Sequence, residues 1–176
     1  MPSDLTAHLT ALIAASARWL LAAYQPPTGA LSRALAEAQA RQATTLAASL
    51  CYPTSVDVQL LHLLAPSGSH RLDWLTGCEP HENDTDTAWR TWVDETVVSW
   101  AACLLADPAL ATRAHQALAT TEHHSETGSL QRLTHPSPLD SEAAALLRHP
   151  DLLEGIAVLH RPQLLQRLEV QGAGLS

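Results

Sequence analysis

The sequence contains no lysine and no phenylalanine, only one asparagine (Asn83) and only two isoleucines (Ile13 and Ile156). Codons for these residue types are rich in A and T, whereas alanine, leucine, proline and arginine are plentiful. The composition therefore indicates a GC-rich bacterial gene. This bias also explains why all ten basic residues are arginine. Without lysine, the chain lacks the residue that forms Schiff bases in covalent catalysis.

Positive charge is scarce and scattered. Ten arginines stand against 18 acidic residues, so the formal net charge is −8 with neutral histidine. The arginines occur singly from Arg18 to Arg167 and form no cluster. Nucleic-acid-binding proteins usually carry a basic patch or an excess of basic residues, so we expect no nucleic-acid partner.

Cysteine is scarce too, and long apolar runs are absent. Cys51, Cys78 and Cys103 are odd in number and widely spaced, which is not typical of a disulfide framework. The N-terminal residues include Asp4 and no basic region, so we expect no secretory signal. Only nine residues separate His8 from Arg18, far fewer than the roughly 20 that span a bilayer. These features predict a cytoplasmic protein with no membrane partner.

The sequence is rich in alanine and leucine spaced with the period of a helix. Apolar positions predict helices over residues 5–24, 28–50, 55–65, 87–106 and 108–123, with a long loop over 66–86. Thr54 and Asp57 have the spacing of a capping box, with Asp in place of the usual Glu. Asp107 and Pro108 supply a cap and a first-turn proline for the fifth helix. No segment alternates convincingly like a strand.

The C-terminal tail carries a faint repeat. Residues 149–154 recur as residues 161–166, and the proline of each copy suits the first position of a short helix. The prediction is an all-α helical bundle of five or six main helices with a short helical tail. We expect one domain over 1–176, with sub-regions at 1–65 (a helical hairpin), 84–124 (a Trp-rich helix pair) and 138–170 (the short-helix tail).

Apolar spacing also predicts which faces are buried. The first helix carries a leucine stripe, and its opposite face is mostly alanine rather than charge. Such a face must be covered, either by the rest of the chain or by a second copy, and a homodimer is the favoured alternative. The alanine face comprises Ala7, Ala11, Ala14, Ala15 and Ala22. The inward stripes expected elsewhere are Leu31, Leu35, Ala38, Gln42, Leu46 and Leu50 in the second helix and Val56, Leu60, Leu63 and Leu64 in the third.

Some histidine and cysteine residues have the spacing of metal ligands, but the sequence shows no complete ligand set. Cys78 and His81 have the spacing of half a zinc knuckle, and Glu122, His123 and His124 could supply further ligands. A regularly spaced second half is missing, and adjacent histidines on a helix point about 100° apart. The acidic residues before the fourth helix suit its N-terminal partial charge. We therefore expect no bound metal and no cofactor.

Motifs for nucleophilic or phosphate chemistry are absent. There is no G-x-S-x-G and no G-x-x-x-x-G-K sequence, and no Glu has a His three positions later. A catalytic cysteine with a distant histidine remains open, although Cys51 and Cys103 lie in apolar helices and are expected to be buried. No catalytic residue is identified.

Tryptophan is the most distinctive residue type. Trp89, Thr96 and Trp100 follow the core period of a helix, so packing is the simpler interpretation. The functional interpretation is a partner- or ligand-binding surface, because tryptophan is enriched at interface hot spots. Its candidate residues are Trp74, Trp89, Trp92 and His81.

Two functions remain in contention. The leading hypothesis is a non-enzymatic protein–protein interaction or accessory module of a bacterial cytoplasmic system, binding a protein partner or itself. The alternative is a small-molecule-binding helical protein or metal-independent enzyme, with a pocket lined by Trp and His. A metal-dependent enzyme is a third hypothesis. A solid core with an exposed apolar patch favours the first, and a deep cavity holding histidines or acids favours the second.

Overall fold

The computed structural model describes residues 3–61, 94–125 and 128–173, and every regular element in these ranges is a helix. The predicted all-α bundle is confirmed. In chain order the elements are α1 (Ser3–Ala23), α2 (Ala30–Cys51), α4 (Glu95–Ala106), α5 (Pro108–Leu118), α6 (Gln131–Thr134), α7 (Pro138–Ala143), the 3₁₀ turn η2 (Leu146–Arg148) and α8 (Pro150–Ala173). Residues 55–61 are also helical. None of the helices in the described ranges is long and apolar enough to cross a membrane.

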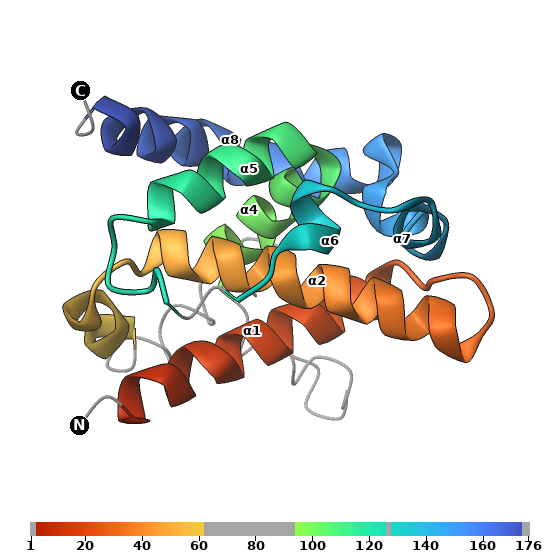
Figure 1. The fold of residues 1–176 in the computed structure, drawn as a ribbon, viewed down its shortest axis with the longest axis horizontal. Coiled ribbons are helices and arrows are strands. Elements are labelled where there is room, and N and C mark those ends of the chain that lie inside the picture. The colour runs from red at the N-terminus through yellow and green to blue at the C-terminus, as the bar shows by residue number, and fades with distance from the viewer. Residues whose placement is uncertain (1–2, 62–93, 126–127, 174–176) are drawn as a thin grey trace, which may run out of the picture.

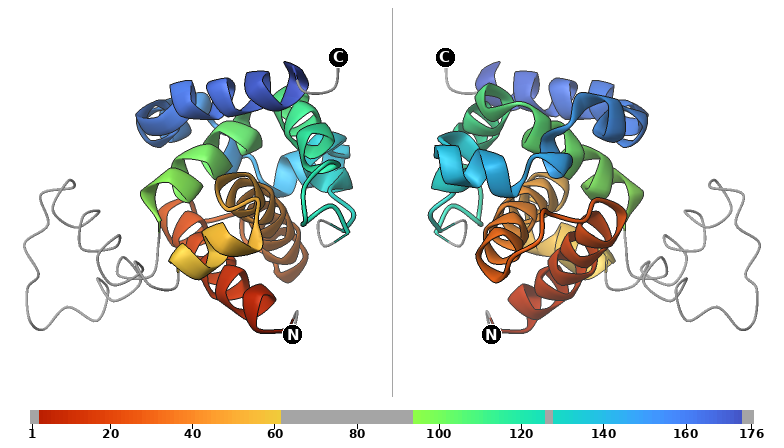
Figure 2. Two further views of the ribbon diagram at one scale, coloured as in Figure 1. Left: turned by 90° about the vertical axis from the view of Figure 1, so that its left-hand side faces the viewer. Right: turned by 90° about the vertical axis from the view of Figure 1, so that its right-hand side faces the viewer.

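The main helices stack in the order α1, α2, α4 and α8 (Figures 1 and 2). Helix α2 is the central element, because it also packs against α5, α6 and α7. Helix α1 lies along one edge of the bundle and α8 along the opposite edge (Figure 1). A continuous apolar core draws residues from α1, α2, α4, α5 and α8 and from the short helices between α5 and α8.

Helix α2 can occupy the centre of the bundle because the side chains on its buried face are small. Ala36, Ala40, Ala43 and Ala47 are fully buried and recur at helical spacing, so neighbouring backbones can approach closely. The predicted leucine stripe is right for Leu46 and Leu50, which are fully buried, and wrong for Leu31, which is 66% exposed. The first turn of α2 is largely exposed, and Leu31 is exposed with it.

Helix α1 is covered on part of both faces. Leu9, Leu12 and Leu20 enter the main core, as the leucine stripe predicts. On the other side Ala15 packs with Val98 of α4, and Ile156 of α8 closes over them. Ala14 is half-buried, whereas Ala11 and Ala22 are exposed. The same chain therefore covers Ala15, which a second copy could have covered. The side chain of Ala7 lies outside the described part.

The segment over residues 55–61 begins as predicted and faces the other way. Asp57 Oδ2 accepts from Thr54 N at 3.1 Å, and Thr54 Oγ1 accepts from Asp57 N at 3.2 Å, which confirms the capping box. The inward stripe was wrong, because Val56 and Leu60 are exposed while Val58 is buried. Two apolar faces compete in this short segment, and sequence spacing does not choose between them. Leu63 and Leu64 lie outside the described residues.

The first residues of helices α4 and α5 are determined by aspartate N-caps. Asp94 is extended and its Oδ1 accepts from Thr96 N and Val97 N, so α4 begins at Glu95. The prediction of one unbroken helix over 87–106 is therefore wrong at Asp94, and residues 87–93 lie outside the described part. Asp107 caps α5 ahead of Pro108, as predicted.

The expected end of the fifth helix near residue 123 is also wrong. Helix α5 ends at Leu118. The Thr120 and Thr121 hydroxyls donate to the carbonyls of Ala117 and Leu118 at 3.2 and 3.0 Å. Such local bonds compete with the helical ladder.

A buried polar network fixes the short helices against α2. Gln39, fully buried on α2, donates to the backbone carbonyl of Asp140 at 2.7 Å and accepts from Arg148 Nε at 2.9 Å. The Asp140 carboxylate accepts from Ser137 Oγ and from Arg132. Burial alone would raise the pKa of Asp140, but the hydrogen bonds from Ser137 and Arg132 outweigh it and lower that pKa.

Helix α8 corrects the prediction of separate short helices in the tail. Pro150 occupies its first position, as expected, but Pro162 lies inside the same helix. A proline inside a helix cannot donate its backbone bond and normally bends or ends the helix. Side chains of α4 bond to backbone groups of α8 immediately before Pro162.

Candidate functional site

The residues proposed from sequence as a binding surface, Trp74, Trp89, Trp92 and His81, all lie between residues 62 and 93, outside the described part of the chain. Cys78 lies there too. Their proposed role stays a prediction.

The two flanks of that segment are tied together. The Tyr52 hydroxyl donates to Asp94 Oδ2, which joins the end of α2 to the start of α4. His123 Nε2 lies 2.8 Å from the carbonyl oxygen of Tyr52, and Glu122 accepts from the backbone N–H of Ser55 at 2.8 Å. Glu122 and His123, considered above as metal ligands, therefore contact the backbone. No group of three His, Cys, Asp or Glu side chains suited to a metal occurs in the described ranges.

Tyr52 and its neighbour Cys51 are both half-buried, so the prediction that Cys51 is buried is only partly right. Burial raises the pKa of Cys51 to about 12, and the nearby Asp94 charge adds to this effect. Burial also raises the pKa of Tyr52, together with the Cys51 and Asp94 charges. A thiol that is protonated at neutral pH is a poor nucleophile, so Cys51 has the character of a structural cysteine.

Helices α4 and α8 are joined by hydrogen bonds close to Pro162. Ser99 Oγ accepts from His160 N at 3.0 Å and donates to the carbonyl of Ala157 at 3.3 Å. Trp100 Nε1 donates to the carbonyl of His160 at 3.1 Å. Three side chains of α4 therefore serve backbone groups of α8, the third being Cys103, whose thiol also reaches the Ala157 carbonyl at 3.2 Å.

Trp100 and Cys103, both expected from sequence to be core residues, have packing roles in this contact. Trp100 is buried, as the core period predicts, and its indole N–H has a backbone partner. Cys103 is buried, as predicted, and burial raises the pKa of its thiol. Both side chains hold α8 against α4.

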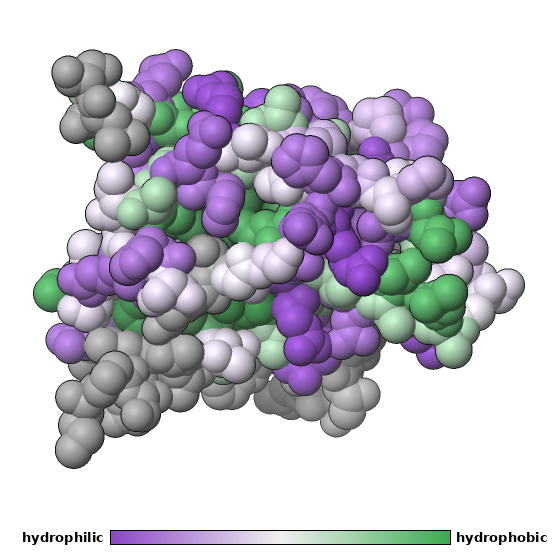
Figure 3. Space-filling view, in the orientation of Figure 1, coloured by the Kyte–Doolittle hydropathy of each residue, from purple (hydrophilic) through white to green (hydrophobic). Residues whose placement is uncertain are grey.

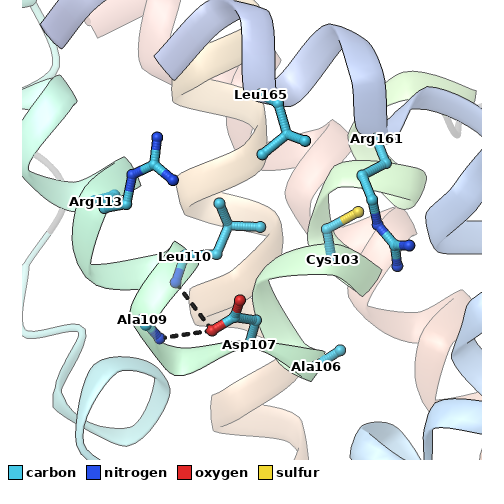
Figure 4. Close-up of a pocket in the computed structure, with 8 residues that line it drawn as sticks. All are labelled: Cys103, Ala106, Asp107, Ala109, Leu110, Arg113, Arg161 and Leu165. Atoms are coloured by element: carbon cyan, nitrogen blue, oxygen red, sulfur yellow. Dashed lines mark hydrogen bonds between the residues drawn. The ribbon is translucent and has the colours of Figure 1, made fainter. Parts of the chain in front are cut away.

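A cavity of about 260 Å³ opens beside Cys103, where the end of α4, the start of α5 and the middle of α8 converge (Figure 4). Arg113 from α5 and Arg161 from α8 lie at opposite sides, with Leu110 and Leu165 between them. Asp107 lies below them, and its Oδ1 accepts from Ala109 N and Leu110 N at 2.9 and 3.1 Å. The cavity thus combines cationic edges with an apolar wall.

The two guanidinium groups differ in their partners. Arg161 Nη1 and Nη2 each donate to a carboxylate oxygen of Glu154 at 2.9 Å. This hydrogen bonding raises the pKa of Arg161 and lowers that of Glu154. Arg113 is exposed and makes no ion pair with any residue in the described ranges. Neither arginine was predicted as a site residue, because residues 48 apart in the chain come together only in the fold.

A second hollow of about 380 Å³ lies between α1 and α2. Its lining is largely apolar, with Arg41 at the edge already paired to Glu37. Neither cavity is lined by tryptophan or histidine. The pocket of the alternative functional hypothesis is thus not one of these two hollows.

The outward face of α8 carries large apolar side chains. Leu152, Val158, Leu159 and Val170 are between 42% and 64% exposed, and Gly155 and Pro162 lie among them, also exposed. Sequence analysis missed this face because it expected short helices packed on several sides. The signal was present: apolar residues occur around the whole helix, more than one buried face can use.

A smaller apolar area lies elsewhere. Figure 3 shows apolar surface at the edge of the molecule where α7 meets the start of α2. Leu139 of α7 and Leu31 of α2 are the large exposed apolar residues on these elements. Each helix contributes only one such side chain, so this area offers less than the outward face of α8.

Comparison with protein-family models, curated proteins and solved structures finds no match.

Proposed function

We propose that this protein is a non-enzymatic interaction module that self-associates through the outward face of α8. The carrying observation is the exposure of Leu152, Val158, Leu159 and Val170 on that one helix. A solvated helix face normally carries charged and polar residues. Large apolar side chains exposed together on one helix are typical of a contact with another molecule.

The spacing of Leu152, Leu159 and Val170 places these three side chains along one line of α8. Leu152 and Leu159 lie seven residues apart, which is close to two helical turns, and Val170 follows eleven residues later, close to three turns. Gly155 and Pro162 stand between them with little bulk to hold a partner away. Gln163 and Gln166 supply polar contacts on the same exposed side.

A two-fold dimer is the simplest assembly for such a face. Closed dimers with two-fold symmetry are the commonest homo-oligomers, and they use the same patch on both subunits. In an antiparallel pair of α8 helices, Leu152 of each subunit would lie near Val170 of the other. This proposal moves the expected homodimer from α1 to α8, because Ala15 of α1 is already covered by Val98 and Ile156.

The chemistry of the described thiols supports a non-enzymatic role. Burial raises the pKa of Cys51 and of Cys103, so neither supplies a thiolate at neutral pH. The hydroxyl of Ser99 is committed to the backbone of α8.

The experiment measures the mass of the full chain by light scattering over a range of micromolar concentrations. Wild type should approach twice the 18.9 kDa chain mass, and Leu159→Glu should return to the monomer while keeping its helical circular dichroism. The matched control is Val56→Glu, which places the same charge at a residue of similar exposure on another helical segment. A monomeric wild type at every concentration overturns self-association. Equal dissociation by both variants overturns the assignment to α8.

A further inference from the structure

The cavity beside Cys103 is lined by two positively charged side chains, although the protein as a whole is acidic. The chain carries a net charge of −8, yet two of its ten arginines line this one hollow. Arg161 is already neutralised by the two-pronged contact with Glu154. Arg113 has no ion pair in the described ranges, so its guanidinium is the free charge at the cavity edge.

The acid in this cavity does not balance Arg113. Asp107 accepts from two backbone N–H groups at the start of α5. Its negative charge is therefore set against the positive partial charge of that helix end. The carboxylate has no ion pair with Arg113, and the cavity keeps a cationic edge.

The rest of the cavity is suited to a short apolar body. Leu110 and Leu165 lie between the two arginines, and Ala106 and Ala109 line the same hollow (Figure 4). A volume of about 260 Å³ is below the range of about 300–1,000 Å³ that holds drug-sized molecules. The occupant must therefore be small.

We propose that this cavity binds a small aliphatic carboxylate, with its head group on Arg113 and its carbon chain against Leu110 and Leu165. A guanidinium presents paired N–H donors that match the two oxygens of a carboxylate. Arg161 closes the opposite end of the cavity, where its guanidinium is held by Glu154 and by the Cys103 thiol, so Arg113 is the group that receives the carboxylate. Cys103 contributes its thiol to the wall and no chemistry. The site is separate from the outward face of α8.

The test titrates butyrate and hexanoate into the full chain and follows the Nε–H signals of the arginine side chains by NMR. The Arg113 signal should move and saturate. Hexanoate should bind more tightly than butyrate, by about fourfold for each added methylene group. Butyramide, which has the same shape without the charge, should leave the signal unchanged. Inorganic phosphate binding as tightly as hexanoate would overturn the apolar part of the site.

Matched variants locate the binding. Arg113→Gln should weaken hexanoate binding at least about tenfold, because it removes a charged hydrogen-bond partner. Arg33→Gln, which neutralises an exposed arginine of α2 that makes no ion pair within the described ranges, should stay within about twofold of wild type. Leu159→Glu should also leave binding unchanged, so this result does not depend on self-association. Equal losses in Arg113→Gln and Arg33→Gln, or no saturable shift at millimolar ligand, would overturn the proposal.

Discussion

Helix α2 and helix α8 use apolar residues in opposite ways. Helix α2 is enclosed by α1, α4, α5, α6 and α7, and most of its buried residues are alanine, serine or threonine. Helix α8 contains larger apolar residues, yet it packs along one edge and leaves four of them exposed. Central position in this fold therefore follows small side-chain size rather than high apolar content. In the proposed dimer, the large exposed side chains of α8 contact a second copy of the chain.

The largest expected effect compares one leucine from each helix. Leu46→Ala in α2 should lower the free energy of unfolding by about 2–5 kcal/mol, because it leaves a cavity at a fully buried position. Leu159→Ala in α8 should change that free energy by less than about 0.5 kcal/mol when the chain is dilute, because the side chain is 53% exposed. Urea unfolding at low protein concentration measures both. Similar losses in the two variants would contradict the contrast between the helices.

The next effect tests how α8 is held against α4. Ser99→Ala should cost about 1–3 kcal/mol, because the partly buried backbone N–H of His160, next to Pro162, loses the Ser99 hydroxyl as its acceptor. Ser141→Ala is the matched control, since Ser141 is exposed on α7 and its hydroxyl makes no bond in the described ranges. The control should stay within about 0.5 kcal/mol of wild type. Urea midpoints compare the two variants, and equal midpoints would mean that the Ser99 hydroxyl does not stabilise α8 beside Pro162.

The smallest effect concerns the polar network on the flank of α2 and depends on pH. The native pKa of Asp140 lies below its unfolded value of about 3.9, so the carboxylate stabilises the fold above about pH 4. This stabilisation is lost as the pH falls through the native pKa. Asp140→Asn should therefore cost roughly 1–2 kcal/mol at pH 7, with the difference from wild type shrinking in acid. Denaturant unfolding at pH 7 and pH 3 measures it. A difference that stays constant across this range would mean that the charge of Asp140 contributes nothing.

Local chemistry was the part of the fold most readily predicted from sequence. Capping at Thr54 and Asp57 and at Asp107 depends on nearby residues alone, and both caps were predicted. The capping box of Ser137 and Asp140 has the same spacing and was overlooked. Burial faces were harder to predict. Leu31 and Val56 are exposed although their spacing predicts burial, because burial depends on how the helices are arranged.

The continuity of α8 could not be predicted from its own residues. Pro162 indicates a helix boundary, whereas the hydrogen bonds that hold α8 beside it come from Ser99 and Trp100, about 60 residues earlier in the chain. The candidate sites show the same limit. Arg113 and Arg161 are unremarkable in the sequence and line one cavity in the fold. The tryptophans at 74, 89 and 92 remain a prediction from sequence.

The most direct measurement of the central claim follows the methyl signals of leucine and valine by NMR as the full chain is diluted. We predict concentration-dependent shifts for Leu152, Val158, Leu159 and Val170, because their exposed methyl groups enter the contact between two copies. Val56 and Leu139, which are as exposed on other helical segments, should keep constant shifts. Shifts that move at Val56 and Leu139 instead, or at no exposed methyl group, would contradict self-association through α8.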